Sequence, residues 1–314
     1  MPVNDFMIFA GSSNLPLANR IAQKLGKELG NLELKRFSDG EIWVKYGENI
    51  RGREVFIIQS TNPPSDNILE LLILLDAAKR ASSKRITAVL PYFGYSRQDR
   101  KDQPRVSITA KLMANLITEA GADRVITMDL HAAQIQGFFD IPFDHLYGSS
   151  IFINHIKDLS DNLAVVSPDV GGIKVARAYS KMLNSNLIVI DKRRLSHNKA
   201  EVMNIIGDPN GKDILLVDDL IDTAGTFVGA IRALKDKGAK KIFGAITHPM
   251  LSGKAMERLE QSELETLFVT DTIDKGSLKL SKIKVISASD LFAEALLRTF
   301  NNESISSLFN IDKG

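Results

Sequence analysis

Two adjacent carboxylates, Asp218 and Asp219, stand between the apolar run 214–217 and a short turn of small and hydroxyl-bearing residues. Like charges repel, and burying an unpaired carboxylate is costly, so the pair indicates a binding partner. Vicinal hydroxyls of a sugar or a hydrated Mg²⁺ are suitable partners for carboxylate oxygens. The stretch DILLVDDLIDTAGT, residues 213–226, therefore predicts a polar ligand site at the end of a buried strand.

The turn that follows, Asp222 to Thr226, leads into a predicted helix. Free N–H groups and the positive end of the helix dipole favour a phosphate at a helix N-terminus. Ala224 and Gly225 allow a close approach of the backbone, and Thr223 and Thr226 add hydroxyl donors. These features together predict a sugar phosphate as the ligand. The alternative is an acidic surface loop in which Thr226 only caps the helix.

Short runs rich in Val, Ile and Phe recur along the chain, and most are continuously apolar, which is typical of parallel strands covered on both faces. Helices are predicted between many of them, including 107–120 and 68–80, the second with Asn67 as its cap and Glu70 completing a capping box. This alternation predicts an α/β fold with right-handed crossovers. The predicted strands are 6–10, 55–59, 86–90, 125–128, 164–167, 187–190, 214–217, 242–246, 267–270 and 283–287.

The number of predicted strands is too large for one doubly wound domain of this length. We therefore expect two mostly parallel sheets of about five strands each, flanked by helices. The boundary is expected near Gly148, which gives an N-terminal domain 1–148 and a C-terminal domain 149–314. The final helix, 290–300, could pack on either domain, and the sequence leaves this open.

The composition excludes several classes of protein. Of the 314 residues, 44% are apolar, and 40 Lys and Arg against 38 Asp and Glu give a net charge of +2, so no nucleic acid is expected as a partner. The absence of cysteine excludes disulfides and thiolate zinc sites and fits a reducing compartment. The N-terminus lacks a signal-peptide pattern, and acidic residues interrupt the most apolar helix. A cytoplasmic protein without membrane association is expected.

The string ILLVDDLIDTAGT resembles the motif that binds phosphoribosyl diphosphate (PRPP) in type I phosphoribosyltransferases and ribose-phosphate pyrophosphokinases, and the chain has no Walker A string. Further strings across the chain resemble the pyrophosphokinases. They are FSDGEIWV (37–44), PYFGYSRQDRK (91–101), DLHAAQIQGFF (129–139), SPDVGG (167–172), DKRR (191–194), EVMNIIGD (201–208) and THPMLSGKA (247–255). The resemblance implies two type I phosphoribosyltransferase-like domains, and transfer of the diphosphoryl group of ATP to the anomeric hydroxyl of ribose 5-phosphate, giving PRPP and AMP.

The resemblance assigns the ATP-binding residues to the N-terminal domain. Residues 97–105 carry six formal charges in nine positions, which by composition alone is typical of a solvated loop. By resemblance, Arg97 and Gln98 contact ATP, and Phe37, Asp39 and Glu41 recognise adenine. The hairpin that carries the last three is implied to reach the ATP site of a neighbouring subunit. A homo-oligomer, commonly a hexamer in this family, is therefore expected.

The resemblance also assigns Mg²⁺ as the cofactor. His131 looks like a ligand of Mg²⁺–ATP and Asp169 resembles the second metal position, and oxygen ligands with retained waters suit this ion. Asp129 is a further candidate for the first position. The other four histidines are expected to be structural or on the surface. These are His145, His155, His197 and His248.

Ribose 5-phosphate and the catalytic cations are assigned to the C-terminal domain. By resemblance, Lys192 and Arg194 are the catalytic pair on an active-site flap between residues 190 and 214, and Arg194 also contacts ribose 5-phosphate. Cations at this place suit phosphoryl transfer, which depends on neutralising phosphate oxygens. The full set implied to bind ribose 5-phosphate is Arg194, Asp218, Asp219, Asp222, Thr223, Ala224, Gly225 and Thr226.

The chain departs from the family pattern at Ser65, at Ser107 and within 46–49, and by resemblance the last segment lies near regulatory and subunit-contact surfaces. A non-catalytic regulatory subunit associated with PRPP synthetase is the main alternative, and it would be expected to have lost flap cations or ATP contacts. A phosphoribosyltransferase would need one PRPP domain and a base-binding hood. A PRPP-sensing repressor would need an added winged-helix domain. The leading hypothesis is an active, Mg²⁺-dependent pyrophosphokinase.

Overall fold

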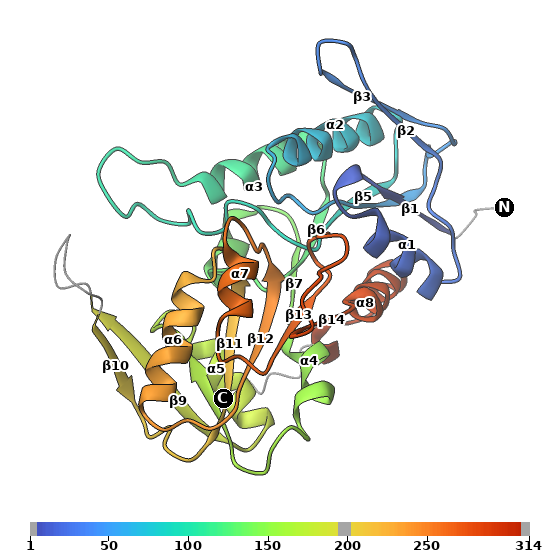
Figure 1. The fold of residues 1–314 in the computed structure, drawn as a ribbon. Helices are drawn as coiled ribbons and strands as arrows, with labels where there is room; N and C mark the ends of the chain where they lie inside the picture. The colour runs from blue at the N-terminus through green and yellow to red at the C-terminus, as the bar shows by residue number, and fades with distance from the viewer. Residues whose placement is uncertain (1–4, 194–201, 309–314) are drawn as a thin grey trace. The chain divides into compact units, whose positions relative to one another are not determined.

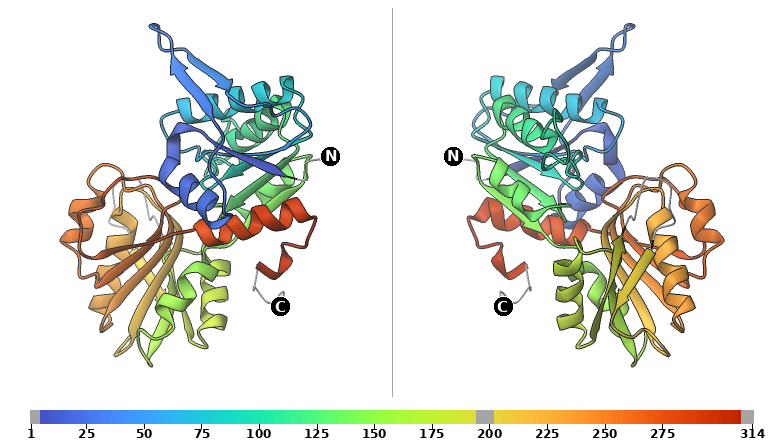
Figure 2. Two further views of the ribbon diagram at one scale, coloured as in Figure 1. Left: turned by 90° about the vertical axis from the view of Figure 1, so that its right-hand side faces the viewer. Right: turned by 90° about the vertical axis from the view of Figure 1, so that its left-hand side faces the viewer.

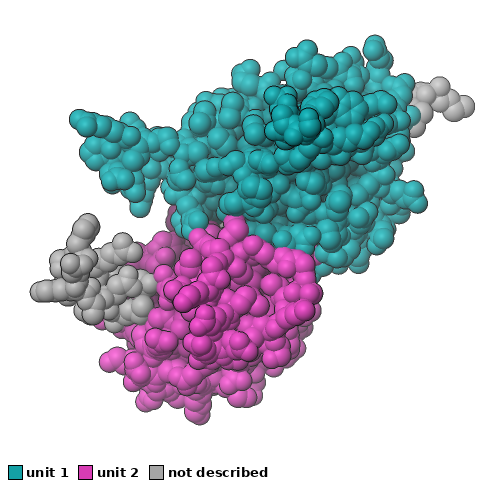
Figure 3. All heavy atoms as spheres, turned by 45° about the horizontal axis from the view of Figure 1, so that its top comes forward, with its two compact units in different colours: residues 1–147, 272–274, 287–309 teal, residues 148–271, 275–286, 310–314 magenta. Residues whose placement is uncertain are grey.

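The computed structural model describes residues 5–193 and 202–308. The chain forms two compact units, coloured separately in Figure 3. Unit 1 comprises residues 1–147, 272–274 and 287–309, and unit 2 comprises residues 148–271, 275–286 and 310–314. The first change from one unit to the other therefore falls between Tyr147 and Gly148.

Unit 1 is built on a parallel five-stranded sheet. Its strands are almost fully buried because helices cover both faces, with α2 and α3 on one side and α1 and α8 on the other (Figures 1 and 2). The sheet order is β1 (Phe6–Ala10), β4 (Glu54–Ile58), β5 (Arg85–Leu90), β6 (Arg124–Met128) and β7 (Phe143–Leu146). The helices are α1 (Leu15–Lys24), α2 (Asp66–Arg80), α3 (Thr109–Ala120) and α8 (Ser289–Asn301).

Shorter elements complete unit 1. The strands β2 (Leu32–Arg36) and β3 (Ile42–Tyr46) form an antiparallel hairpin that projects away from the main sheet (Figure 2). Three short 3₁₀ helices are also present in the described residues of the unit. They are η1 (Ser12–Asn14), η2 (Ala133–Phe138) and η3 (Ser306–Leu308).

The start of α2 differs from the predicted capping box. The helix begins at Asp66, and Ser65 at the cap position makes no capping bond from its side chain. Asn67 instead donates from its side chain to the carbonyl of Asn62. Glu70 is buried and accepts hydrogen bonds from the Ser12 hydroxyl, at 2.8 Å, and the Gln59 amide, at 2.9 Å. The capping prediction was wrong because a nearby carbonyl engages Asn67 and the distant side chains of Ser12 and Gln59 engage Glu70.

Unit 2 is built on a seven-stranded sheet, in which only the β10–β9 pair is antiparallel. The prediction of mostly parallel sheets is confirmed, although this sheet is larger than expected because the segment after β9 returns as an edge strand. The order is β10 (Val202–Ile206), β9 (Asn186–Arg193), β8 (Leu163–Ser167), β11 (Asp213–Ile221), β12 (Ile242–Pro249), β13 (Thr266–Thr270) and β14 (Ile283–Ile286).

The continuously apolar strands of unit 2 supply two cores, one on each face of the sheet. Along β11, Ile214 and Leu216 pack in the core that includes α6 and α7, whereas Leu215 and Val217 pack in the core that includes α4 and α5. This alternation follows from the two-residue repeat of a strand. The helices are α4 (Ser149–Ile156), α5 (Ile173–Met182), α6 (Gly225–Asp236) and α7 (Ala255–Glu260).

The helix α8, whose position the sequence left open, belongs to unit 1. It packs against α1, and the rings of Phe6 and Phe300 lie 4.8 Å apart. Arg85 donates to the carbonyl of Thr299 at 3.0 Å. No helix within the described parts of the chain is both long and apolar enough to cross a membrane.

Candidate functional site

The paired carboxylates of unit 2 lie inside β11 rather than after it. The strand continues to Ile221 because its pairing with β12 extends that far, whereas its pairing with β8 ends at Leu216. The prediction of a strand end at Val217 was therefore too short. Asp218 and Asp219 lie on the part of β11 that has passed the last register pair with β8. This is the carboxyl end of the sheet, where open α/β sheets bind ligands.

The turn after β11 has an unusual backbone. Ala224 has φ 59° and ψ 5°, a left-handed conformation that costs a residue with a Cβ about 1 kcal/mol. The helix α6 begins at the next residue, and no side chain caps it, which contradicts the alternative in which Thr226 only caps the helix. Strain of this kind is concentrated at ligand sites.

The rest of the turn is accessible to a ligand. Thr223, Gly225 and Thr226 are exposed, whereas Ala224 is buried. A Cβ at Gly225 would lie 3.5 Å from Arg258 Nη1 and 3.8 Å from Thr223 Oγ1, which are ordinary contacts. Packing within the protein therefore does not require glycine here, and the missing side chain leaves room beside the first turn of α6.

The segment after β12 braces this turn. Arg258 Nη1 donates to the carbonyl of Thr223 at 2.7 Å, and the N–H of Ser252 donates to the carbonyl of Asp222 at 3.0 Å. The Ser252 hydroxyl also donates to the Asp222 carboxylate. Sequence reasoning missed both Arg258 and Ser252. The string THPMLSGKA contains Ser252, but nothing local in it indicates a partner about thirty residues earlier in the chain.

A third carboxylate approaches the pair in β11. Asp169 follows β8, and its Oδ1 accepts from the N–H of Gly172 at 2.9 Å. A Cβ placed on Gly172 would lie 3.8 Å from Asp169 Oδ1 and 4.0 Å from Asp218 Oδ1, so the two carboxylates converge on this glycine. Burial, assisted by the charges of Asp219 and Asp169, raises the pKa of Asp218 well above its ordinary value.

This arrangement fits an incomplete cation site. Among the described residues, no three His, Asp or Glu side chains form a closed metal-binding group. Mg²⁺ does not require one, because it usually keeps several waters and binds through one or two carboxylates together with phosphates of the substrate. The converging Asp169 and Asp218 supply such carboxylates, and a divalent cation beside them would relieve their repulsion.

In unit 1, the predicted metal ligand His131 is exposed on the turn after β6. Asp129 in this turn has φ 34°, so this turn, like the one after β11, contains a non-glycine residue with a positive φ. The N–H of Asp129 donates to the carbonyl of Leu146 at 3.0 Å, and the N–H of Leu130 donates to His145 Nε2 at 2.9 Å. His145 was expected to be structural or on the surface, and it is buried against this turn.

The predicted ATP contacts of unit 1 lie in two exposed places. Arg97 and Gln98 are exposed in the segment between β5 and α3, and Gln98 Oε1 accepts from the Thr109 hydroxyl at 2.6 Å. The other group sits at the tip of the β2–β3 hairpin, and Figure 1 shows the two segments projecting from different sides of unit 1. That group consists of Phe37, Asp39 and Glu41, all exposed, with 56% of Phe37 accessible.

Of the predicted catalytic pair, Lys192 lies within the described residues and Arg194 lies outside them. Lys192 lies in β9, at the register position opposite Met203 of β10, and β10 lies within the string EVMNIIGD. His197 also lies outside the described residues.

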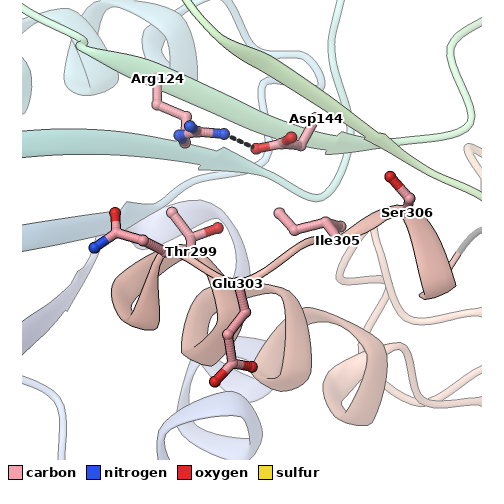
Figure 4. Close-up of a pocket in the computed structure, with 7 residues that line it drawn as sticks. Arg124, Asp144, Thr299, Glu303, Ile305 and Ser306 are labelled. Carbon is pink, nitrogen blue, oxygen red and sulfur yellow. Dashed lines mark hydrogen bonds and ion pairs between the residues drawn. The ribbon is translucent and has the colours of Figure 1, made fainter.

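Unit 1 also contains a pocket that no predicted site residue lines. Its volume is about 270 Å³, and Figure 4 shows Arg124 and Asp144 paired across one wall, opposite the end of α8. The lining residues are Arg124, Asp144, Thr299, Asn302, Glu303, Ile305 and Ser306.

Comparison with known proteins finds similarity along nearly the whole chain. A family model described as the N-terminal domain of ribose phosphate pyrophosphokinase matches residues 6–121, and one described as the phosphoribosyl synthetase-associated domain matches residues 192–310. The ribose-phosphate pyrophosphokinase of Chlorobaculum tepidum is 59% identical over 305 residues, which are 96% of this chain and 94% of that protein. The one from Campylobacter jejuni is 54% identical and covers 97% of this chain and 99% of its own.

A solved structure agrees with these relatives. The crystal structure of phosphoribosylpyrophosphate synthetase from Mycobacterium smegmatis matches with a TM-score of 0.89 at 37% identity. The match covers 95% of this chain and 99% of that chain. The similarity in sequence and the similarity in fold therefore point to the same group of proteins.

Proposed function

This chain belongs to the ribose-phosphate pyrophosphokinase family, and from that membership we propose how its residues bind the two substrates and form PRPP. The chain is a ribose-phosphate diphosphokinase, which makes PRPP and AMP from ATP and ribose 5-phosphate for nucleotide biosynthesis. The main support for this function is the 59% identity to the ribose-phosphate pyrophosphokinase of Chlorobaculum tepidum along 96% of the chain. The geometry of the two units supports the division of roles given below.

Ribose 5-phosphate binds in unit 2. Its phosphate occupies the turn formed by Asp222, Thr223, Ala224, Gly225 and Thr226, where the helix dipole of α6 and the backbone N–H groups favour an anion. The exposed hydroxyls of Thr223 and Thr226 add donors.

The sugar hydroxyls bind to the acids of β11. Asp218 and Asp219 accept hydrogen bonds from the vicinal hydroxyls, which offsets their mutual repulsion. The Asp222 carboxylate already accepts from Ser252, so its contribution is to fix the turn that holds the phosphate.

ATP binds through unit 1, with Arg97 and Gln98 on its phosphates. A guanidinium is suited to this contact because its planar fork matches phosphate oxygens. Adenine is recognised by Phe37, Asp39 and Glu41 at the hairpin tip of a neighbouring subunit. An aromatic side chain that is 56% exposed on a projecting hairpin supports a partner outside the chain.

The active form is therefore a homo-oligomer, which we propose to be a hexamer, in the cytoplasm. Mixing Phe37→Ala chains with Arg97→Ala chains tests the shared site. Each variant alone is expected to be nearly inactive, and subunit exchange is expected to restore part of the activity, because some sites then receive an intact hairpin and an intact Arg97. No recovery after demonstrated exchange would contradict the shared site.

Mg²⁺ would be the cofactor, with His131 as a ligand at a first position in unit 1 and Asp169 at a second position in unit 2, each together with substrate oxygens. The fit rests on the carboxylates that converge at Gly172 and raise the pKa of Asp218. When bound, the ion supplies neutralising charge for the phosphate oxygens. The N–H of Gly172 fixes the direction of the Asp169 carboxylate by donating to its Oδ1.

Lys192 and Arg194 carry out the catalytic step as cations beside the transferred group. A phosphoryl transition state spreads charge over the equatorial oxygens, and a well-placed cation stabilises it by about a thousandfold or more. The anomeric hydroxyl of ribose 5-phosphate attacks the β-phosphorus of ATP, the bond from that phosphorus to the α-phosphate oxygen breaks, and AMP leaves. The hydroxyl proton passes to solvent, because a loose transition state needs no strong base.

The direct test is an assay of purified protein with ATP, ribose 5-phosphate and Mg²⁺ that follows AMP. AMP is expected to form, and to be lost when ribose 5-phosphate is omitted or EDTA is added. A non-catalytic regulatory subunit would instead be a folded oligomer that forms no AMP. That result would overturn the proposed activity.

A further inference from the structure

We propose that His145 is a positioning residue for nucleotide binding, which acts through Leu130 to hold the turn that presents His131. This inference rests on the proposed role of His131 in binding Mg²⁺–ATP. Sequence reasoning gave His145 no role, and none of the family motifs described above includes it. The structure places its imidazole directly against the backbone of the turn.

The strand β7 accepts a pair of hydrogen bonds from the turn. The strands β6 and β7 are parallel neighbours, with Thr127 opposite His145 and Met128 opposite Leu146. Beyond this register, the N–H of Asp129 donates to the carbonyl of Leu146 at 3.0 Å, and the N–H of Leu130 donates to His145 Nε2 at 2.9 Å. Two consecutive amides of the turn are therefore bound by two consecutive residues of β7.

The imidazole of His145 is the acceptor in one of these bonds. A histidine nitrogen accepts a hydrogen bond only when it carries no proton, so Nε2 is the acceptor nitrogen of His145 in the bond from Leu130. His145 is only 7% exposed, and its ring lies against Tyr147 with 4.4 Å between the ring centroids. Burial and this stacking limit the ring to few orientations, so Nε2 is a fixed acceptor.

These hydrogen bonds hold a strained backbone in place. Asp129 has φ 34°, and a non-glycine residue at positive φ persists only where its surroundings impose it. Leu130, which donates to His145, is buried, whereas the next residue, His131, is exposed. The buried Leu130 is therefore followed directly by the accessible His131, and the direction of the His131 side chain depends on how Leu130 is held.

The test compares two substitutions of His145. His145→Gln places an amide oxygen near the position of Nε2 and keeps an acceptor, whereas His145→Leu fills similar space without one. His155→Leu is the matched control, because His155 is an exposed histidine of α4 in unit 2. We expect His145→Leu to raise the KM for Mg²⁺–ATP about tenfold, the loss expected from one positioning hydrogen bond. The KM for ribose 5-phosphate should change less than about twofold, and His145→Gln should restore most of the effect.

A second measurement does not depend on turnover. In amide hydrogen exchange, Leu130 is expected to exchange about tenfold faster in His145→Leu, with His145→Gln and His155→Leu close to the original protein. The shift of the His131 ring signals in NMR on addition of Mg²⁺–ATP should shrink in His145→Leu.

Three results would overturn the inference. They are unchanged Leu130 exchange, equal rises in both KM values, and a variant that only melts earlier while its KM for Mg²⁺–ATP is unchanged. Failure of the proposed function has a different signature, because the unsubstituted protein would then form no AMP and its His131 signals would not respond to Mg²⁺–ATP.

Discussion

The turns after β6 in unit 1 and after β11 in unit 2 both contain a strained backbone, but different kinds of hydrogen bond hold the two turns in place. Each follows a strand of a parallel sheet, and each contains one non-glycine residue at positive φ, Asp129 at 34° and Ala224 at 59°. In unit 1, the neighbouring strand supplies acceptors for the N–H groups of the turn. In unit 2, Arg258 and Ser252 supply donors for its carbonyls and for a carboxylate.

This difference explains which ligand chemistry each turn suits. The brace in unit 2 uses none of the N–H groups of the turn, so it does not compete with a phosphate for them. The brace in unit 1 uses two N–H groups, and the turn then presents an imidazole rather than an anion cradle. The backbone groups that are already hydrogen-bonded within the protein therefore determine which ligand each turn can still bind.

In this comparison both turns bind substrates, and neither takes part in breaking the bond within ATP. The substitution Lys192→Ala is the strongest test of this separation. Loss of a cation beside the transferred group is expected to lower kcat by about a thousandfold, with ATP affinity nearly unchanged. Single-turnover kinetics and calorimetric ATP titration measure the two quantities. Retained turnover would show that the chemistry does not depend on the end of β9.

Asp218→Asn tests the polar ligand of the unit 2 turn. An amide cannot replace a carboxylate as acceptor for two hydroxyls, so the KM for ribose 5-phosphate should rise about tenfold to a hundredfold. The KM for ATP, which is assigned to unit 1, should change little. Steady-state kinetics with each substrate varied separately gives the answer, and equal changes in both constants would contradict the division of roles.

Arg258→Met removes the main donor of the unit 2 brace while keeping a long apolar side chain. The KM for ribose 5-phosphate is expected to rise about tenfold, because the carbonyl of Thr223 loses a charge-assisted hydrogen bond and the turn loses its fixed position. Arg258→Lys should recover part of the loss. Arg232→Met, an exposed substitution further along α6, is the control that should leave both KM values unchanged.

Without Mg²⁺, the stability of the protein should also depend on the repulsion among the carboxylates of Asp218, Asp219 and Asp169. Burial and the charges of Asp219 and Asp169 raise the pKa of Asp218 in the folded state, so folding favours its protonated form. The stability gained from protonation is present at low pH and is lost as pH rises through the folded pKa. In EDTA, the Tm of Asp218→Asn should therefore exceed that of the original protein by an amount that grows with pH. A constant difference would argue against the repulsion.

Ala224→Gly has the smallest expected effect and tests the strain itself. Glycine adopts positive φ without steric cost, but it also makes the unfolded chain more flexible, so the free energy of unfolding should change by less than about 1 kcal/mol. Denaturant unfolding measures this change. Ala224→Val is the contrasting variant, since a β-branched residue at φ 59° should destabilise the protein clearly.

Most of the fold was predictable because continuous apolar runs separated by helical patterns specify covered parallel strands. The limits lie where partners are distant in sequence. The end of β11 moved from Val217 to Ile221 because β12 pairs with it there, and Glu70 of the expected capping box was engaged by Ser12 and Gln59. Neither pairing leaves a local signal.

The candidate site shows the same limit. The acids and the small-residue turn in DILLVDDLIDTAGT predicted a phosphosugar site from neighbours in the chain. The residues that fix the turns, Arg258 and His145, could not be found this way, because a lone arginine or histidine in a sequence does not reveal which carbonyl or amide it contacts.

The position of α8 has a consequence for the order in which the protein is made. The five strands of the unit 1 sheet are complete at residue 146, yet the helix that covers Phe6 and contacts Arg85 begins at residue 289. The ribosome synthesises unit 2 in between, which takes on the order of ten seconds. Throughout that interval one face of the first sheet is covered by α1 but not by α8, so the part that α8 later covers offers an apolar surface to chaperones until this helix emerges.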